Sequence, residues 1–195
     1  MPPLGSIRLG AFCDLIGQPR ETVRTAIYAE RFPVREWQGE GQRTFDGRDV
    51  FAFEVFLALT GDGAEHERAA EAVNMSRAAE DFLDAIDRGD GARDLCLVAD
   101  AFAERDPLTG FAEVRGAFTA RAAELGEYIA ARIDPRPSFR RPGRDSDTQP
   151  LGLRRVNVVP LWPCWQMARD RAEAAGYRLY GRHLTTATTD PEASQ

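Results

Sequence analysis

The side chains with the clearest chemistry lie in two groups near the start of the chain, and both are typical of contacts with nucleic acid. The first group is the polar face of a helix expected from Pro19 to about Glu30, and it comprises Arg20, Thr22, Arg24, Thr25 and Tyr28. The second group surrounds the turn Gly39-Glu40-Gly41 and comprises Arg35, Gln42 and Arg43. A guanidinium group can bind phosphate or guanine through two hydrogen bonds at once, and hydroxyl and amide groups add hydrogen bonds to the DNA backbone. These residues therefore predict an interface with double-stranded DNA.

Two short helices must position the first group. Gly10 to Ile16 places apolar residues at the three- and four-residue spacing of an amphipathic helix. Gly17 can end that helix in the left-handed conformation, and Pro19 suits the first position of the next helix. Two short helices joined by a turn of three or four residues are typical of a helix-turn-helix, whose second helix enters the major groove of DNA.

A β-hairpin and a third helix are expected to complete this unit. The hairpin would consist of strands at 34–37 and 42–45, on either side of the glycine turn. A helix beginning after Asp46-Gly47 would bury apolar residues on several sides, namely Val50, Phe51, Phe53, Val55, Phe56 and Leu59. We therefore expect residues 1–61 to form a winged helix-turn-helix.

Three short motifs in this segment carry a resemblance to a known family. They are Thr22-Val23-Arg24 in the second helix, Phe32-Pro33 after it, and Gly41-Gln42-Arg43-Thr44-Phe45-Asp46 in the hairpin. The segment resembles the winged-helix DNA-binding domain of MerR-type regulators and of the related excisionases and phage small terminases. The resemblance covers roughly the first third of the chain and implies that Arg24 and Arg43 contact DNA. Thr25-Ala26 stands where the family has an aromatic pair, and Gln42 stands where its wing has a tyrosine.

Three functions are compatible with this segment. The first is a transcriptional regulator of the MerR-like winged-helix type, the second is a phage-type DNA-handling protein such as a small terminase or excisionase-like recruiter, and the third is a winged-helix scaffold that binds only protein. Residues 1–61 carry a net charge of −1, whereas DNA-binding domains are usually basic. One copy would bind DNA weakly, because neutralisation of phosphates supplies much of the binding free energy. A DNA-binding function therefore predicts a homo-oligomer, with a dimer favoured for a regulator.

Residues 62–134 are acidic, with a net charge of −9, and their pattern predicts helices. The expected helices span Glu65 to Asp87, Ala92 to Ala103 and Phe111 to Ile133, and the last carries an apolar stripe. We expect a small helical bundle that a second subunit completes through this stripe. Residues 80–94 of this region hold six carboxylates, at Glu80, Asp81, Asp84, Asp87, Asp90 and Asp94. They have neither a histidine partner nor the spacing of a calcium loop, so no metal site is predicted.

Residues 135–182 are basic, with a net charge of +6. The stretch 135–155 is rich in proline and arginine and is expected to be a linker, or an arm that lies on DNA. Residues 156–182 are expected to form a small β-α module, whose aromatic residues can fill its own core or bind a protein partner: Trp162, Trp165, Tyr177 and Tyr180. Residues 62–134 and 135–182 have opposite charges. Two interpretations are equally compatible with this: the two parts dock on each other, within or between molecules, or they form two separate solvated faces. Residues 183–195 are expected to be a disordered tail.

Several classes of function find no support in the sequence. His66 and His183 are the only histidines, and neither lies in a motif; no nucleotide-binding or hydrolase signature occurs, so neither enzyme activity nor a cofactor is predicted. No apolar run approaches the length of a transmembrane helix. Cys13, Cys96 and Cys164 fit neither a disulfide framework nor a zinc site, which indicates a reduced, cytoplasmic protein. The expected fold class is mainly α: a winged helix-turn-helix with a small β-wing, a helical bundle and a small C-terminal β-α module.

Overall fold

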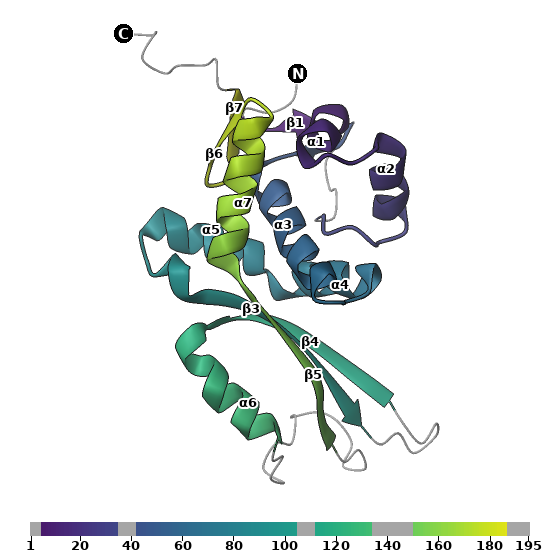
Figure 1. The fold of residues 1–195 in the computed structure, drawn as a ribbon, viewed down its shortest axis with the longest axis vertical. Helices are drawn as coiled ribbons and strands as arrows, with labels where there is room; N and C mark the ends of the chain where they lie inside the picture. The colour runs from purple at the N-terminus through teal and green to yellow at the C-terminus, as the bar shows by residue number, and fades with distance from the viewer. Residues whose placement is uncertain (1–4, 35–41, 105–111, 134–149, 187–195) are drawn as a thin grey trace.

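The computed structural model of the chain describes residues 5–34, 42–104, 112–133 and 150–186. Within these residues the protein is mainly helical, with small antiparallel sheets, as the sequence predicts at this level. The helices are α1 (Leu9–Ile16), α2 (Arg20–Tyr28), α3 (Gly47–Gly61), α4 (His66–Ser76), α5 (Ala78–Arg88), α6 (Leu125–Ile133) and α7 (Leu161–Ala174), with short 3-10 turns at Ala92–Asp94 and Ala122–Glu124. The strands are β1 (Ile7–Arg8), β2 (Thr44–Phe45), β3 (Leu95–Glu104), β4 (Ala112–Arg121), β5 (Pro150–Pro160), β6 (Tyr177–Tyr180) and β7 (His183–Thr186) (Figure 1).

Helix α3 is the centre of the hydrophobic core. Almost every residue in its first three turns is buried, on all sides of the helix, which is typical of a helix surrounded by protein. Asp46 caps its N-terminus: the Asp46 side chain accepts hydrogen bonds from the backbone N–H groups of Arg48 and Asp49, and Asp49 accepts one from the Asp46 N–H in return. Helices α1, α4, α5 and α7 pack around α3 (Figure 1). The expected aromatic helix is thus confirmed, and it lies in the middle of the molecule.

The two short helices before α3 are confirmed. Gly17 ends α1 with φ 67°, in the left-handed region, and its N–H bonds back to the carbonyl of Asp14. Of the expected hairpin, Thr44–Phe45 is a strand, but it pairs in antiparallel register with Ile7–Arg8, directly before α1. The glycine turn and all but the first residue of the other expected strand lie outside the described residues.

The helix expected from Glu65 to Asp87 is two helices, because the chain turns at Arg77. Arg77 has φ 53°, a left-handed conformation that favours glycine, and α4 ends before it while α5 begins after it. Ser76 supports the turn: its hydroxyl donates to the Val73 carbonyl at 3.2 Å and accepts from the Ala78 N–H at 3.2 Å. No glycine or proline marks this break, so the sequence pattern runs through it.

The helix expected at 92–103 and the first half of the helix expected at 111–133 are wrong. Both segments are strands, β3 and β4, and only Leu125–Ile133 is helical. The first residues of β3, Leu95 to Val98, are buried on both faces of the sheet. A strand covered on both faces shows no alternation of apolar and polar residues, so its pattern also fits a helix. The predicted helical bundle is therefore replaced by a sheet with helices on both faces.

This sheet has the strand order β4-β3-β5, with both neighbours antiparallel to β3. Helices α4 and α5 contact one face, and α6 lies on the other (Figure 1). Strand β5 begins at Pro150, inside the stretch that the sequence predicts to be a linker, and continues to Pro160. Pairing with β3 explains why this proline- and arginine-containing segment is regular.

The last part of the chain completes the core of the first part. Trp165 of α7 packs edge-to-face on Phe51 of α3, with ring centroids 5.6 Å apart, and also contacts Phe82 of α5. Hairpin β6–β7 joins the N-terminal segment through two hydrogen bonds, Gly47 N–H to the Arg182 carbonyl and Leu184 N–H to the Gly5 carbonyl, each 3.0 Å. Strand β6 lies within the expected β-α module, whereas the predicted disordered tail begins with a strand, His183–Thr186. No helix among the described residues is both long enough and apolar enough to span a membrane.

Candidate nucleic-acid interface

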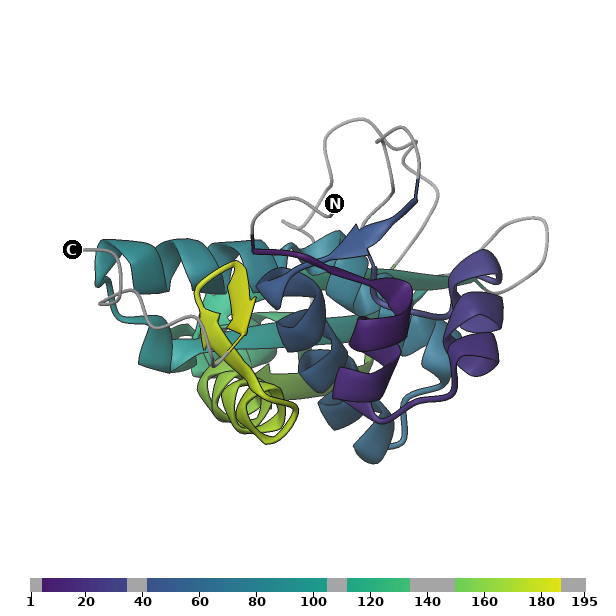
Figure 2. The ribbon, with the colours of Figure 1, turned by 90° about the horizontal axis from the view of Figure 1, so that it is seen from above.

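Helix α2 is the outermost helix on its side of the molecule (Figure 1). It buries a single residue, Val23, while Ala26 and Ile27 are half-buried against the body. All the residues of α2 that the sequence assigns to a DNA interface are exposed, namely Arg20, Thr22, Arg24, Thr25 and Tyr28. Tyr28 is 80% exposed, the largest value among the exposed large hydrophobic residues of the described chain. Figure 2 shows α2 toward one edge of the molecule, with α1 between it and the hairpin β6–β7.

Arg20, Arg24 and Tyr28 form one continuous stripe along α2. They are spaced four residues apart, so their side chains lie on the same face of the helix. Each arginine lies near a carboxylate: Arg20 Nη2 is 4.0 Å from Asp14 Oδ2, and Arg24 Nη1 is 4.0 Å from Glu21 Oε2. All four groups are mostly exposed, and exposed ion pairs of this length contribute little to stability. Both guanidinium groups can therefore turn toward another anion without loss to the fold.

The second predicted group is anchored near the start of α1. Phe45 of β2 is buried and stacks on Phe12 of α1 at 4.2 Å between ring centroids. The Arg43 guanidinium lies over the Phe45 ring, 5.6 Å from its centroid, and Gln42 beside it is exposed. Since Thr44 pairs with Arg8, the residue before α1, strand β2 holds Arg43 near the start of α1. Arg35, the third member of the group, lies outside the described residues.

The carboxylates of the middle region join elements to one another. Glu80 of α5 accepts a hydrogen bond of 2.8 Å from Nε of the buried Arg48 of α3. Burial acts to raise the pKa of Glu80, but the charge and hydrogen bond of Arg48 outweigh it and hold that pKa below its ordinary value. Asp81 accepts a hydrogen bond from the Thr119 hydroxyl at 2.9 Å. Among the described residues, no three His, Cys, Asp or Glu side chains are grouped so that they could hold a metal ion.

The three cysteines are buried, and none is in a disulfide. Burial raises the pKa of each thiol above its ordinary value; it raises the pKa of Cys164 to about 12, and the nearby Glu54 carboxylate adds to that rise. The thiolate is the nucleophilic form of cysteine. A thiol held protonated in the core is a packing residue, and the absence of enzyme activity stays a prediction from the sequence.

Alkylation of the native protein by iodoacetamide at pH 8 should leave Cys164 the least modified of the three thiols. With its pKa near 12, on the order of one Cys164 in ten thousand is ionised at that pH. The same residue in guanidinium chloride should react about as fast as a model thiol. Mass spectrometry of the tryptic peptides measures both rates. Equal rates for Cys164 in the native and unfolded protein would contradict this burial.

Sequence reasoning misses a second group of charged residues, three arginines around a pocket between α4 and the sheet: Arg68, Arg115 and Arg155. They come from segments that the sequence pattern assigns to a helix, a second helix and a linker. Arg115 and Arg155 come close only through the register of the sheet, in which each lies opposite Ala101 of β3. No local signal marks them, because residues 115–121 of β4 read Arg-Gly-Ala-Phe-Thr-Ala-Arg, without a regular alternation of polar and apolar residues.

The chain matches no model of a known protein family and no curated protein. The resemblance of residues 1–61 to winged-helix domains thus rests on three short motifs. The function of this protein must therefore be inferred from its residues and their geometry.

Proposed function

We propose that this protein is a DNA-binding transcriptional regulator that places α2 in the major groove of a duplex, with Arg43 on the neighbouring backbone. The observation that carries the proposal is the exposure of α2. A short helix that buries one residue and turns a stripe of two arginines and a tyrosine outward has most of its surface available to a partner.

The dimensions and chemistry of α2 suit a major groove. A helix with its side chains is about 10–12 Å wide, and the major groove is about 12 Å wide. Arg20 lies at the N-terminal end of α2, where recognition helices present residues to base edges. Arg24, one turn later, can reach a guanine with both hydrogen-bond donors of its fork, while Thr22 and Thr25 on the flanks can contact phosphates.

Charge favours more than one copy on the DNA. The net charge of residues 1–61 is −1, so one copy releases few counterions on binding. A homodimer would double the number of arginine contacts and set the spacing of two half-sites. The apolar stripe that the sequence places on a single helix is divided between β4 and α6, where Leu125 and Ile129 are half-buried. The assembly itself remains part of the proposal.

Replacing Arg24 by alanine should weaken binding to a selected duplex by about 1–3 kcal/mol and relax the preference at one base pair, if the guanidinium binds that base through two hydrogen bonds. Replacing Arg43 should weaken binding equally on all sequences. It should also reduce the slope of log affinity against log salt concentration by about 1, the value for the loss of one phosphate contact. Duplexes selected from a random pool, followed by fluorescence anisotropy at several salt concentrations, supply the measurement. Arg178→Ala is the matched control, because Arg178 is exposed on the distant strand β6.

Other outcomes distinguish the remaining functions. If the folded double variant Arg24→Ala, Arg43→Ala binds the selected duplex as tightly as the natural protein, α2 is not the reading element. The carboxylates beside both α2 arginines favour a second candidate, in which α2 binds a protein; a chain of that kind would retain no duplex at any salt concentration. A phage-type recruiter would bind DNA but form a larger ring than a dimer, which light scattering detects.

A further inference from the structure

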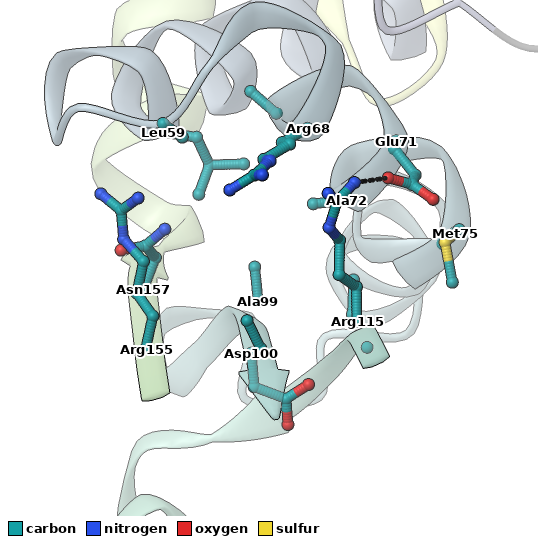
Figure 3. Close-up of a pocket in the computed structure, with 15 residues that line it drawn as sticks. Leu59, Arg68, Glu71, Ala72, Met75, Ala99, Asp100, Arg115, Arg155 and Asn157 are labelled. Atoms are coloured by element: carbon teal, nitrogen blue, oxygen red, sulfur yellow. Dashed lines mark hydrogen bonds and ion pairs between the residues drawn. The ribbon is translucent and has the colours of Figure 1, made fainter. Parts of the chain in front are cut away.

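A pocket lies between helix α4 and the face of the sheet that α4 covers (Figure 3). Its enclosed part has a volume of about 60 Å³, and its mouth is open to solvent. The floor consists of alanines on the sheet, and the roof of alanines and Met75 on α4 with Leu59 from the end of α3. Polar side chains stand around this apolar interior, so the pocket can hold a compact apolar body and a charged group together.

The register of the sheet places the polar residues on both sides of the floor. Ala101 of β3 lies between Arg115 of β4 and Arg155 of β5, and each pair is directly opposite in the ladder. One row further, Ala99 lies opposite both Ala117 and Asn157. Because alternate residues of a strand point to the same face, all six side chains belong to the α4 side of the sheet. Small residues on the central strand leave the space that the longer side chains on the flanking strands enclose.

Arg68 adds a third guanidinium from above. In Figure 3 it extends from α4 into the space over Ala99, with Arg155 on one side and Arg115 on the other. One acidic residue of the lining, Glu71, faces Arg115 from α4, with Oε2 3.3 Å from Arg115 Nη1. The other, Asp100, turns its carboxylate away from the pocket and accepts a hydrogen bond from the Tyr128 hydroxyl of α6. The guanidinium groups thus outnumber the carboxylates that face the interior.

Each of these arginines makes at least one contact within the protein that a bound anion can replace. Arg68 Nε is 3.3 Å from the exposed Glu65 carboxylate, and Arg155 donates a 3.3 Å hydrogen bond to the Gly63 carbonyl. The Arg115–Glu71 pair is also partly exposed. Exposed pairs contribute little to stability, whereas an oxyanion held by two guanidinium forks gains several charge-assisted hydrogen bonds at once.

We propose that this pocket binds a small organic anion, with a carboxylate or phosphate group held by Arg68, Arg115 and Arg155 and a compact apolar body lying on the alanine floor. The site is independent of the DNA-binding proposal, since it shares no residue with α2 or β2. Asn157 can accept or donate a hydrogen bond at the edge of the ligand and so add selectivity.

The test is titration of the full chain, labelled with 13C on its alanine methyl groups, with benzoate, phenyl phosphate and the neutral control benzamide. The stronger of the two anions should shift the methyl signals of Ala99, Ala101 and Ala117 in a saturable way and identify the preferred oxyanion. The affinity for benzamide should be lower by about tenfold or more, because hydrogen bonds to charged groups contribute more than hydrogen bonds between neutral groups. If neither anion exceeds benzamide, or if the shifted signals lie elsewhere, the proposal is wrong.

Variants locate the charge and the body of the ligand. Arg155→Gln should weaken anion binding by about tenfold or more, and Ala101→Leu should abolish it by filling the floor. Glu71→Gln should strengthen binding several-fold, since it removes the carboxylate that competes for Arg115. Arg121→Gln is the matched control: Arg121 lies on the same strand and face as Arg115 and pairs with Asp90 at 3.8 Å, but it lines no part of the pocket. Unchanged affinity in folded Arg155→Gln and Ala101→Leu proteins would overturn the assignment.

Discussion

Replacing Arg171 by methionine is expected to lower the free energy of unfolding by about 3–5 kcal/mol, because it leaves a charge buried without its partner. Arg171 of α7 pairs with Glu54 of α3, which has no exposed surface. The same guanidinium donates to the Ile16 carbonyl at 3.4 Å and lies 5.9 Å from the centre of the Phe53 ring. One side chain thus joins α7 to α1 and α3. Denaturation by urea, followed by circular dichroism, measures the loss.

The double variant Glu54→Leu, Arg171→Met is the control for this prediction. It removes both charges and leaves apolar groups of similar size, which is often close to neutral for a buried pair. Its free energy of unfolding should recover most of the loss seen in Arg171→Met. A single variant as stable as the natural protein would contradict the assignment of Arg171 as the partner that buried Glu54 needs.

Replacing Trp165 by alanine should lower the free energy of unfolding by a similar amount, about 3–5 kcal/mol. Trp165 is 4% exposed, and its ring touches Phe51 and Phe82, so its loss opens a cavity where α3, α5 and α7 meet. Trp162 is the matched control, one turn earlier in the same helix. It is half-buried, with its ring near Phe82 and under the Arg93 guanidinium at 4.9 Å, and its replacement should have a clearly smaller effect. If the two variants unfold at the same denaturant concentration, α7 does not close the core in this way.

Both predictions bear on how function should be tested. The residues after Pro160 supply the cover for α1, α3 and α5. A fragment that ends before α7 would lack this cover and expose the apolar surface of α3. Loss of DNA binding by such a fragment would report unfolding, so point variants of the full chain are the sound comparison.

The first two helices and the start of α3 could be predicted because their signals are local. Gly17 adopts a left-handed conformation that other residues resist, and Asp46 caps a helix through its own side chain. Each residue acts through the backbone beside it. The exposure of Arg20 and Arg24 was predictable for the same reason, since Val23 fixes which side of α2 faces the core.

The sheet could not be predicted, because its determinants are not local. Residues 95–98 are all buried. One face of their strand lies against α4 and α5, and the other face lies on the side of the sheet where α6 packs, so no alternation of apolar and polar residues marks them as a strand. Arg77 breaks the helix before them in a conformation usual for glycine, and its sequence gives no warning. The three-arginine pocket cannot be predicted without this sheet, because Arg115 and Arg155 come together only where β4 and β5 flank β3. Sequence spacing alone places these residues in unrelated elements.

The contacts between α7 and the first helices have a consequence for biosynthesis. Glu54 and its partner Arg171 are separated by 117 residues, and Ile16 and Arg171 by 155. A ribosome that adds 5–20 residues per second needs roughly 6–23 s to make the chain between Glu54 and Arg171. During that time the aromatic surface of α3 has been synthesised but its cover has not. The nascent chain must therefore either wait in a collapsed, incompletely packed state or be held by a chaperone until α7 has left the exit tunnel.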